Sequence, residues 1–170
     1  EEIKIMFLEK ENNKLKTSDL LPFNEIDSKI WDIQSDIFIP CASSRLLQLD
    51  HVERLIKSGV ELISAGANVP FADKEIFYGS VAEHADNNLS VIPDFISNCG
   101  MARVFAYLME KRQLELTDQD IFQDCSQTIL TALQSCYEYN SSKVGITSTA
   151  LELALKKLLN WLKDGYNFTY

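Results

Sequence analysis

Three residues follow predicted strands at regular spacing, and their side chains could bind a small ligand. Asn68 and Asn98 each stand in a turn after an apolar run of strand length, and Ala42 stands in the turn after an earlier run. The intervals are 26 residues (68 − 42) and 30 residues (98 − 68), each long enough for one crossover helix and one strand. An asparagine amide offers both a donor and an acceptor, which suits hydroxyl and carboxamide groups. Because open parallel sheets present ligand-contacting loops at the carboxyl ends of their strands, we expect the three turns to share one rim.

The elements that must position these turns alternate between strand and helix. Predicted strands cover residues 2–8, 36–40, 60–64 and 89–92. Predicted helices cover residues 24–30, 43–58, 73–85 and 95–112, followed by two more that begin near Thr117 and Thr147 and carry apolar stripes expected to pack in the core. This order predicts an α/β fold: a Rossmann-like, mostly parallel sheet of about four strands with flanking helices and an all-helical C-terminal part.

Length, composition and charge bound the class of protein. With 170 residues and 46% hydrophobic residues, the chain fits one domain over 1–170, divided into a sheet portion (1–112) and C-terminal helices (113–170). A formal net charge of −9 argues against nucleic acid and anionic membranes as partners. No apolar run approaches the ~18 residues of a membrane span, and the first residues do not resemble a signal peptide, so we expect a cytoplasmic protein. The four cysteines lack metal-ligand spacing, which predicts reduced thiols and no metal site.

The three turns also resemble a known family. The segments DIFIPCA (36–42), GANVP (66–70) and IPDFISNCG (92–100), in this order and at these intervals, resemble the cofactor-binding domain of the glutamate/leucine/phenylalanine/valine dehydrogenases. The resemblance runs from about residue 31 to residue 107, and more loosely over the rest. It implies an NAD(P)-binding domain whose parent protein oxidatively deaminates an L-amino acid such as glutamate to the 2-oxo acid and ammonia.

The resemblance implies cofactor contacts at four positions of this sequence. Ala42 matches a small residue beside the cofactor ribose and nicotinamide, and Asn68 and Asn98 match two asparagines near the nicotinamide end. Glu9, at the end of the first predicted strand, falls where an acidic residue would hold the adenosine ribose hydroxyls; a carboxylate there favours NAD over NADP, because it repels a 2′-phosphate. From the residues alone, other interpretations stay open: a tight turn at Ala42, helix capping by Asn98 and an ordinary strand end at Glu9.

Two features of a complete dehydrogenase cannot be matched in this sequence. The six glycines include no pair two residues apart, so the G-x-G-x-x-G loop that cradles a pyrophosphate is absent. Together with the abrupt start, this predicts a fragment that begins after the glycine loop and binds NAD or NADP weakly or not at all. The family's catalytic lysines and aspartate belong to an earlier domain, so no catalytic residue is assigned and we expect no turnover by this chain alone.

Two substitutions leave the parent's activity and its amino acid open. Phe105 stands where the family often has a substrate-contacting serine, and Met101 replaces a glycine. The main hypothesis is a cofactor-domain fragment of a homo-oligomeric enzyme that binds its amino acid through a further domain. The alternative is a degenerate, non-catalytic relative that acts as a regulatory or oligomerising domain; an upstream glycine loop and lysine-bearing domain in the gene would separate the two. A third hypothesis is an unrelated small-molecule binder with a flavodoxin-like sheet, which a phosphate or flavin bound at the strand ends would favour.

Overall fold

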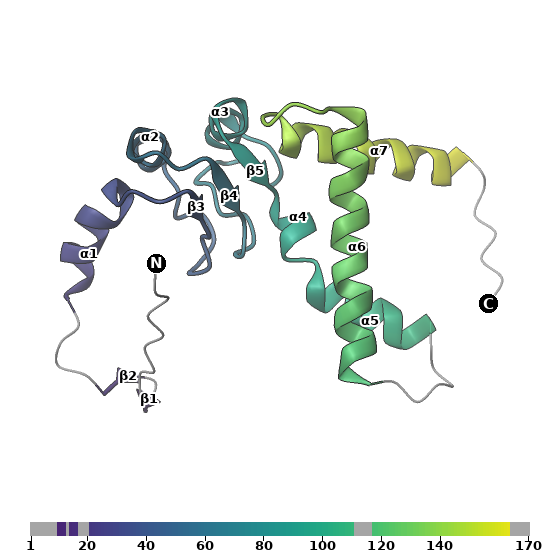
Figure 1. Ribbon diagram of the computed structural model, residues 1–170, viewed down its shortest axis with the longest axis horizontal. Helices are drawn as coiled ribbons and strands as arrows, with labels where there is room; N and C mark the ends of the chain where they lie inside the picture. Colours follow the sequence, from purple (N-terminus) through teal and green to yellow (C-terminus); the bar gives the residue numbers. More distant parts are fainter. Residues whose placement is uncertain (1–9, 13, 17–20, 111–116, 164–170) are drawn as a thin grey trace.

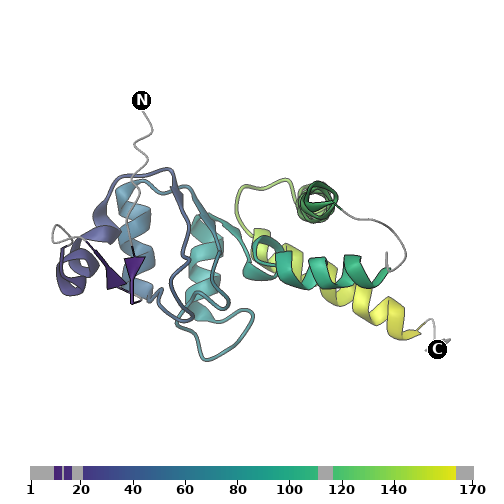
Figure 2. The same cartoon turned by 90° about the horizontal axis from the view of Figure 1, so that it is seen from below.

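The structure is a computed structural model, and it describes residues 10–12, 14–16, 21–110 and 117–163. A sheet with its covering helices occupies one end of an elongated molecule, and long helices occupy the other (Figures 1 and 2). A short antiparallel hairpin comes first, formed by β1 (Lys10–Glu11) and β2 (Lys14–Leu15). The strand predicted over 2–8 and the candidate residue Glu9 lie outside the described residues.

The main sheet consists of three parallel strands, which are β3 (Ile37–Phe38), β4 (Leu62–Ser64) and β5 (Ser90–Ile92). They lie in the order β3-β4-β5, and the crossovers contain α2 (Leu49–Ser58) and α3 (Ser80–Asn88). The predicted α/β class with parallel pairing is confirmed. The strand count differs, because the described residues supply three parallel strands where the sequence predicts about four.

The principal core lies between one face of this sheet and the pair α2 and α3, which pack side by side (Figure 2). Ile63 and Val91 point from neighbouring strands into this layer and are almost fully buried. Val52 and Leu55 of α2 meet them, since a spacing of three residues keeps both on one helix face. Burial of each such aliphatic side chain contributes about 1.5–3 kcal/mol. Helix α2 ends at Gly59, whose φ of 95° is a left-handed conformation that glycine adopts without steric cost.

A short N-terminal unit closes the open side of this core. It comprises α1 (Phe23–Lys29) and the 3-10 helix η1 (Ile30–Asp32), and it confirms the helix predicted over 24–30. Trp31 is buried and stacks on the His51 ring, with ring centroids 4.0 Å apart. The Arg54 guanidinium binds the Asp32 carboxylate and lowers its pKa through their hydrogen bonds, which fastens η1 to α2.

The remaining elements are helices, which are α4 (Asp94–Ser97), α5 (Gly100–Glu110), α6 (Asp118–Tyr139) and α7 (Ile146–Lys163). Helix α6 packs against α5 near one end and against α7 near the other (Figure 1). A second, smaller core of Ile96, Cys136 and Ala150 joins α4, α6 and α7. The predicted all-helical C-terminal part is confirmed. The predicted division between 112 and 113 falls in residues 111–116, outside the described residues.

Three predicted helix boundaries are wrong, each because tertiary contacts compete with the local pattern. Helix α2 begins at residue 49, not 43, because Leu47 forms a bridge with Phe71 and Arg45 adopts a φ of 60°. Helix α3 begins at residue 80, not 73; the Asp73 carboxylate caps it from outside the helix. The helix predicted over 95–112 is two helices, since the backbone leaves helical geometry at Asn98.

The apolar stripes of the last two helices differ in how much of each is buried. In α6, Cys136 is buried and Ile129 and Leu133 pack against the second core, as predicted. In α7 only the first turns are buried, while Leu155 and Leu158 are 49% and 48% exposed. The expected core packing is therefore wrong for the second half of α7. Among the described residues, no helix is both long and apolar enough to span a membrane.

Candidate functional site

The turns that follow β3, β4 and β5 lie along one rim, because the three strands are parallel and end at the same edge. Hydrogen bonds join each turn to the next. The backbone N–H of Ala67 donates to the Pro40 carbonyl at 2.7 Å, and the Ser97 hydroxyl donates to the Ala65 carbonyl at 2.6 Å. The rim is thus one continuous hydrogen-bonded surface.

The structure brings two of the predicted site residues into direct contact. The Asn98 amide nitrogen Nδ2 donates to the Asn68 oxygen Oδ1 at 2.6 Å, and both side chains are exposed. Helix capping was the other interpretation of Asn98, but its side chain bonds across the rim, and α5 begins two residues later at Gly100. The bond leaves Nδ2 of Asn68 and Oδ1 of Asn98 for a ligand, which places a donor and an acceptor next to each other.

Ala42 lies in the first of the three turns and is exposed. Its neighbour Cys41 packs against Gly66 so closely that a Cβ on Gly66 would come within 2.4 Å of the Cys41 sulfur. A side chain at position 66 would have to displace the Cys41 sulfur, so glycine lets the second turn pack closely against the first. Among the described residues, Ala42 shares the rim with the two asparagines but takes no part in their hydrogen bond. Glu9, the fourth predicted residue, lies outside the described part of the chain.

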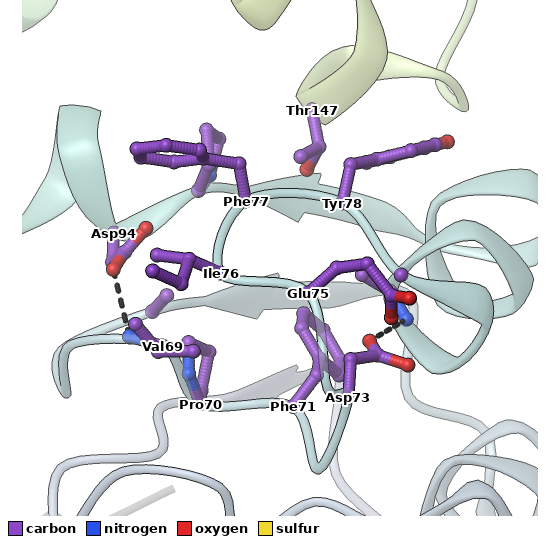
Figure 3. Close-up of a pocket in the computed structure, with 14 residues that line it drawn as sticks. Val69, Pro70, Phe71, Asp73, Glu75, Ile76, Phe77, Tyr78, Asp94 and Thr147 are labelled. Carbon is purple, nitrogen blue, oxygen red and sulfur yellow. Dashed lines mark hydrogen bonds between the residues drawn. The ribbon is translucent and has the colours of Figure 1, made fainter.

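Asp94 holds the second and third turns together, and sequence reasoning missed it. Its carboxylate accepts the backbone N–H of Val69 at 2.8 Å through Oδ2 (Figure 3). It also accepts the backbone N–H of Phe95 at 2.9 Å through Oδ1. Val69 has a φ of 47°, a left-handed conformation that is strained for a β-branched residue. An aspartate directly after a proline at a helix start is the sequence signal that could have suggested this anchoring role.

An apolar cavity of about 420 Å³ opens beside the first turn, and it too was missed. It lies between α1, η1 and the loop after β3. Its wall includes Phe23, Ile30, Trp31, Phe38, Ala42 and Leu46. The indole nitrogen of Trp31, a residue of this wall, is a buried donor that has no hydrogen-bond partner within the described part of the chain. The cavity was invisible in the sequence because α1 meets this loop only in the folded chain.

A second, narrower pocket lies between the loop after β4 and the start of α7 (Figure 3). The side chains of Asp73, Tyr78, Asp94 and Thr147 in its wall form hydrogen bonds within the protein. The Asp73 carboxylate accepts the backbone N–H groups of Val81 and Ala82 at 2.8 and 2.9 Å. Burial, aided by the neighbouring Asp86 carboxylate, raises the pKa of Tyr78 to about 12. These contacts give the pocket a structural role. Within the described ranges, no cluster of three or more His, Cys, Asp or Glu side chains could hold a metal ion.

Asp86 joins the α/β part to the long helices. It is fully buried in α3, and its carboxylate accepts the backbone N–H groups of Thr147 and Ser148 at 2.8 and 3.0 Å. Thr147 also donates its hydroxyl to the Val91 carbonyl in β5 at 2.9 Å. A carboxylate at a helix N-terminus is favoured by both the free N–H groups and the helix dipole. The start of α7 is therefore fixed relative to the sheet.

Comparison with solved structures shows the same fold in glutamate dehydrogenases. A glutamate dehydrogenase matches with a TM-score of 0.65 and 17% identity, over 82% of this chain and 32% of the other. Two glutamate dehydrogenases of Plasmodium falciparum each match with a TM-score of 0.61 over 79% of this chain, at 19% and 21% identity. The chain spans 29% and 30% of the length of these two proteins.

Comparison at the sequence level agrees. An NADP-specific glutamate dehydrogenase of Haemophilus influenzae is 50% identical over 40 residues, which are 24% of this chain and 9% of that protein. A family model described as glutamate/leucine/phenylalanine/valine dehydrogenase matches residues 2–164, nearly the whole chain. Together with the parallel sheet and its rim of three turns, this match shows that the chain belongs to the glutamate/leucine/phenylalanine/valine dehydrogenase family.

Proposed function

We propose that this chain is the cofactor-binding part of an NAD(P)-dependent amino-acid dehydrogenase, and that the rim receives the nicotinamide end of the cofactor. The observation that carries the proposal is the 2.6 Å hydrogen bond between Asn98 and Asn68 at the carboxyl ends of parallel strands. Open parallel sheets bind their ligands at this edge. Membership of the dehydrogenase family supports the same assignment.

The rim residues fit the nicotinamide end of such a cofactor. Asn68 retains two N–H donors and Asn98 a carbonyl acceptor, which match the donor and acceptor groups of ribose hydroxyls and of a carboxamide. The small side chain of Ala42 lets a ligand approach the backbone of the first turn. Asp94 and Gly66 hold the turns in place, so these groups are positioned before a ligand arrives. A bound nicotinamide would supply the hydride acceptor for oxidation of the amino acid.

This chain has fewer groups that could bind the pyrophosphate of the cofactor than could bind its nicotinamide end. A pyrophosphate is normally held by a glycine-rich loop and a helix N-terminus, and this sequence has no G-x-G-x-x-G. Each missing charge-assisted hydrogen bond forfeits about 1.5–3 kcal/mol of binding free energy. We therefore expect weak binding of NAD or NADP, with a dissociation constant in roughly the millimolar range, and no turnover, by this chain alone.

The remaining partners belong to the proposed parent protein. An amino acid such as glutamate would bind through a further domain, and its oxidation would give an imine that water hydrolyses to the 2-oxo acid and ammonia. The parent would be a cytoplasmic homo-oligomer. The adenosine contact of Glu9 and the division into 1–112 and 113–170 stay predictions.

Titration with nicotinamide nucleotides, followed by NMR of the asparagine side-chain amides, tests the proposal. Nicotinamide mononucleotide and NAD at millimolar concentration should shift the amide signals of Asn68 and Asn98. The signal of Asn87, which is exposed on α3, is the internal control and should not move. Asn68→Ala should abolish the shift at Asn98, whereas Asn87→Ala should leave it. A shift confined to other residues, or submicromolar affinity for NAD, would refute the proposal.

The degenerate-relative hypothesis rests on a specific observation. Met101 and Phe105 of α5 are 66% and 61% exposed, and neither side chain can hydrogen-bond an amino-acid substrate. Exposed apolar residues suit a regulatory or oligomerising domain, which does not need to hydrogen-bond an amino-acid substrate. The same titration separates the two functions: a degenerate relative gives no shift at Asn68 or Asn98 with any nicotinamide nucleotide.

A further inference from the structure

Two of the four cysteines approach each other where α4, α5 and α6 meet. Cys99 follows Asn98 in the break between α4 and α5, and Cys125 lies in the second turn of α6. The Cys125 sulfur lies 3.8 Å from the carbonyl oxygen of Gly100, the residue directly after Cys99. Both cysteines are half-buried, which leaves each thiol open to a small reagent.

Neighbouring contacts fix the positions of Cys99 and Cys125 relative to each other. The Arg103 backbone N–H donates to the Cys99 carbonyl at 2.9 Å, so Cys99 lies one helical turn before Arg103. The Arg103 guanidinium binds the Asp124 carboxylate, with Nε 2.5 Å from Oδ2 and Nη2 3.0 Å from Oδ1. Asp124 directly precedes Cys125. The ion pair and the two cysteines therefore lie next to each other along the contact between α5 and α6.

The surroundings favour the protonated form of the Cys99 thiol in the resting protein. Burial, and then the nearby Cys125, raise the pKa of the Cys99 thiol above its ordinary value. Since the thiolate is the species that attacks a disulfide, Cys99 reacts slowly near neutral pH. The other two cysteines lie elsewhere: Cys41 is exposed on the sheet rim, and Cys136 is buried in the second core.

We propose that Cys99 and Cys125 are a reversible thiol–disulfide pair that links the α4–α5 junction to α6. The oxidant is a low-molecular-weight disulfide such as oxidised glutathione. One cysteine thiolate attacks a glutathione sulfur, which breaks the glutathione disulfide and releases one reduced glutathione. The second cysteine then attacks the mixed disulfide and releases the other. Two protein thiols are oxidised, one disulfide is reduced, and the two protons end on the two glutathione thiols.

The proposed disulfide would constrain the segment next to the rim. It would fasten the residue after Asn98 to α6 and close a loop of 26 residues (125 − 99). Closing such a loop removes conformations from the unfolded chain, so oxidation should raise the thermal midpoint by about 5 °C or more. The chemistry does not require a bound cofactor, so the pair and the proposed cofactor role can fail independently.

Mass spectrometry after equilibration in glutathione redox buffers tests the pair. Trypsin digestion without reduction should yield residues 75–103 joined to residues 113–143, two hydrogens lighter than the sum of the free peptides. Fragmentation of the joined peptide should place the bond at Cys125 and not at Cys136. Dithiothreitol should separate the peptides and reverse the rise in the thermal midpoint.

Cysteine variants supply the controls. Cys99→Ser and Cys125→Ser should each abolish the joined peptide and the thermal shift, whereas Cys41→Ser should leave both unchanged. The wild-type protein alone is decisive if a variant fails to fold. Glutathione adducts on Cys99 and Cys125 without a bond between them, or a bond from Cys99 to Cys41, would overturn the proposal.

Discussion

The α/β part and the helical part of this molecule are held together in different ways. The first has a core of eleven buried residues, and its turns are tied by short hydrogen bonds between neighbouring loops. The second has three buried residues in its core, and its contact between α5 and α6 is held by the ion pair of Arg103 with Asp124. Among the described residues, the geometry of the rim thus depends mainly on the α/β part. The helices add Asn98, which α4 carries to Asn68.

Large apolar side chains reach the surface in both parts. Helices α5 and α7 expose several, including Phe105, Met109, Leu155, Leu158 and Leu159. The α/β part exposes Phe23, Ile37, Ile39, Ile76 and Phe77, while α2 and α3 cover the central residues of its sheet. The two parts therefore differ in the size of their buried cores and not in whether apolar residues are exposed.

The largest expected loss of stability comes from replacing Asp86, whose hydrogen bonds join the two parts. Asp86→Ala should lower the free energy of unfolding by about 3 kcal/mol, because the buried N–H of Thr147 and the partly buried N–H of Ser148 at the start of α7 lose their acceptor. Amide exchange should speed up in α7 and remain slow in α2. The matched control is Asn87→Ala, an exposed neighbour that should change stability by less than about 0.5 kcal/mol. A cost below about 1 kcal/mol with unchanged exchange in α7 would mean that Asp86 does not join the regions.

A smaller loss of stability should follow from adding a side chain at Gly66 in the rim. Gly66→Ala should cost about 1–2 kcal/mol, because the new methyl group would overlap the Cys41 sulfur. Cys41→Ala removes that sulfur, so the double variant should recover most of the loss in a double-mutant cycle. Gly100→Ala, in the helical region, is the control, because nothing lies within 4 Å of its added methyl group. Equal costs at both glycines would contradict the tighter packing of the rim.

The smallest expected effect depends on pH and tests Tyr78, whose hydroxyl donates to Asp86 at 3.1 Å. Tyr78→Phe should cost about 1 kcal/mol at neutral pH through the lost hydrogen bond. Burial raises the Tyr78 pKa in the folded state from 10.0 to about 12, so its contribution is complete below pH 10. The contribution is lost as the pH rises toward 12, because only the unfolded chain ionises readily there. Denaturation of the wild-type protein and of Tyr78→Phe between pH 8 and 11 should show that the difference between their free energies of unfolding becomes smaller as the pH rises. A difference that does not change with pH would contradict this prediction.

The sequence predicted the parts of this protein that follow from local pattern. Strands β3, β4 and β5 fall within predicted apolar runs, and the capping box at Thr117 and Asp120 marks the start of α6 as expected. It also indicated that Asn68 and Asn98 would share a rim, since parallel strands end at one edge. It could not indicate the break at Asn98, because a helical apolar period continues through that residue.

Tertiary contacts explain the other misses. The Asp73 carboxylate caps α3 from seven residues before the helix, so the local signal placed the helix start too early. The cavity at Trp31 exists only because α1 folds against the loop after β3. The exposed stripe of α7 has the same period as a buried one, and periodicity cannot tell whether a partner surface is present.

The sequence by itself determined the α/β class, the order of the parallel strands' turns and the residue types at the rim. These depend on apolar runs, turn residues and spacing, which are properties of short segments. Only the tertiary structure decided that Asn98 bonds to Asn68, that Asp94 and Asp86 anchor the turns and α7, and that Cys99 lies beside Cys125. Those pairings join residues far apart in the chain. Their distances depend on how helices and strands pack, which no local pattern specifies.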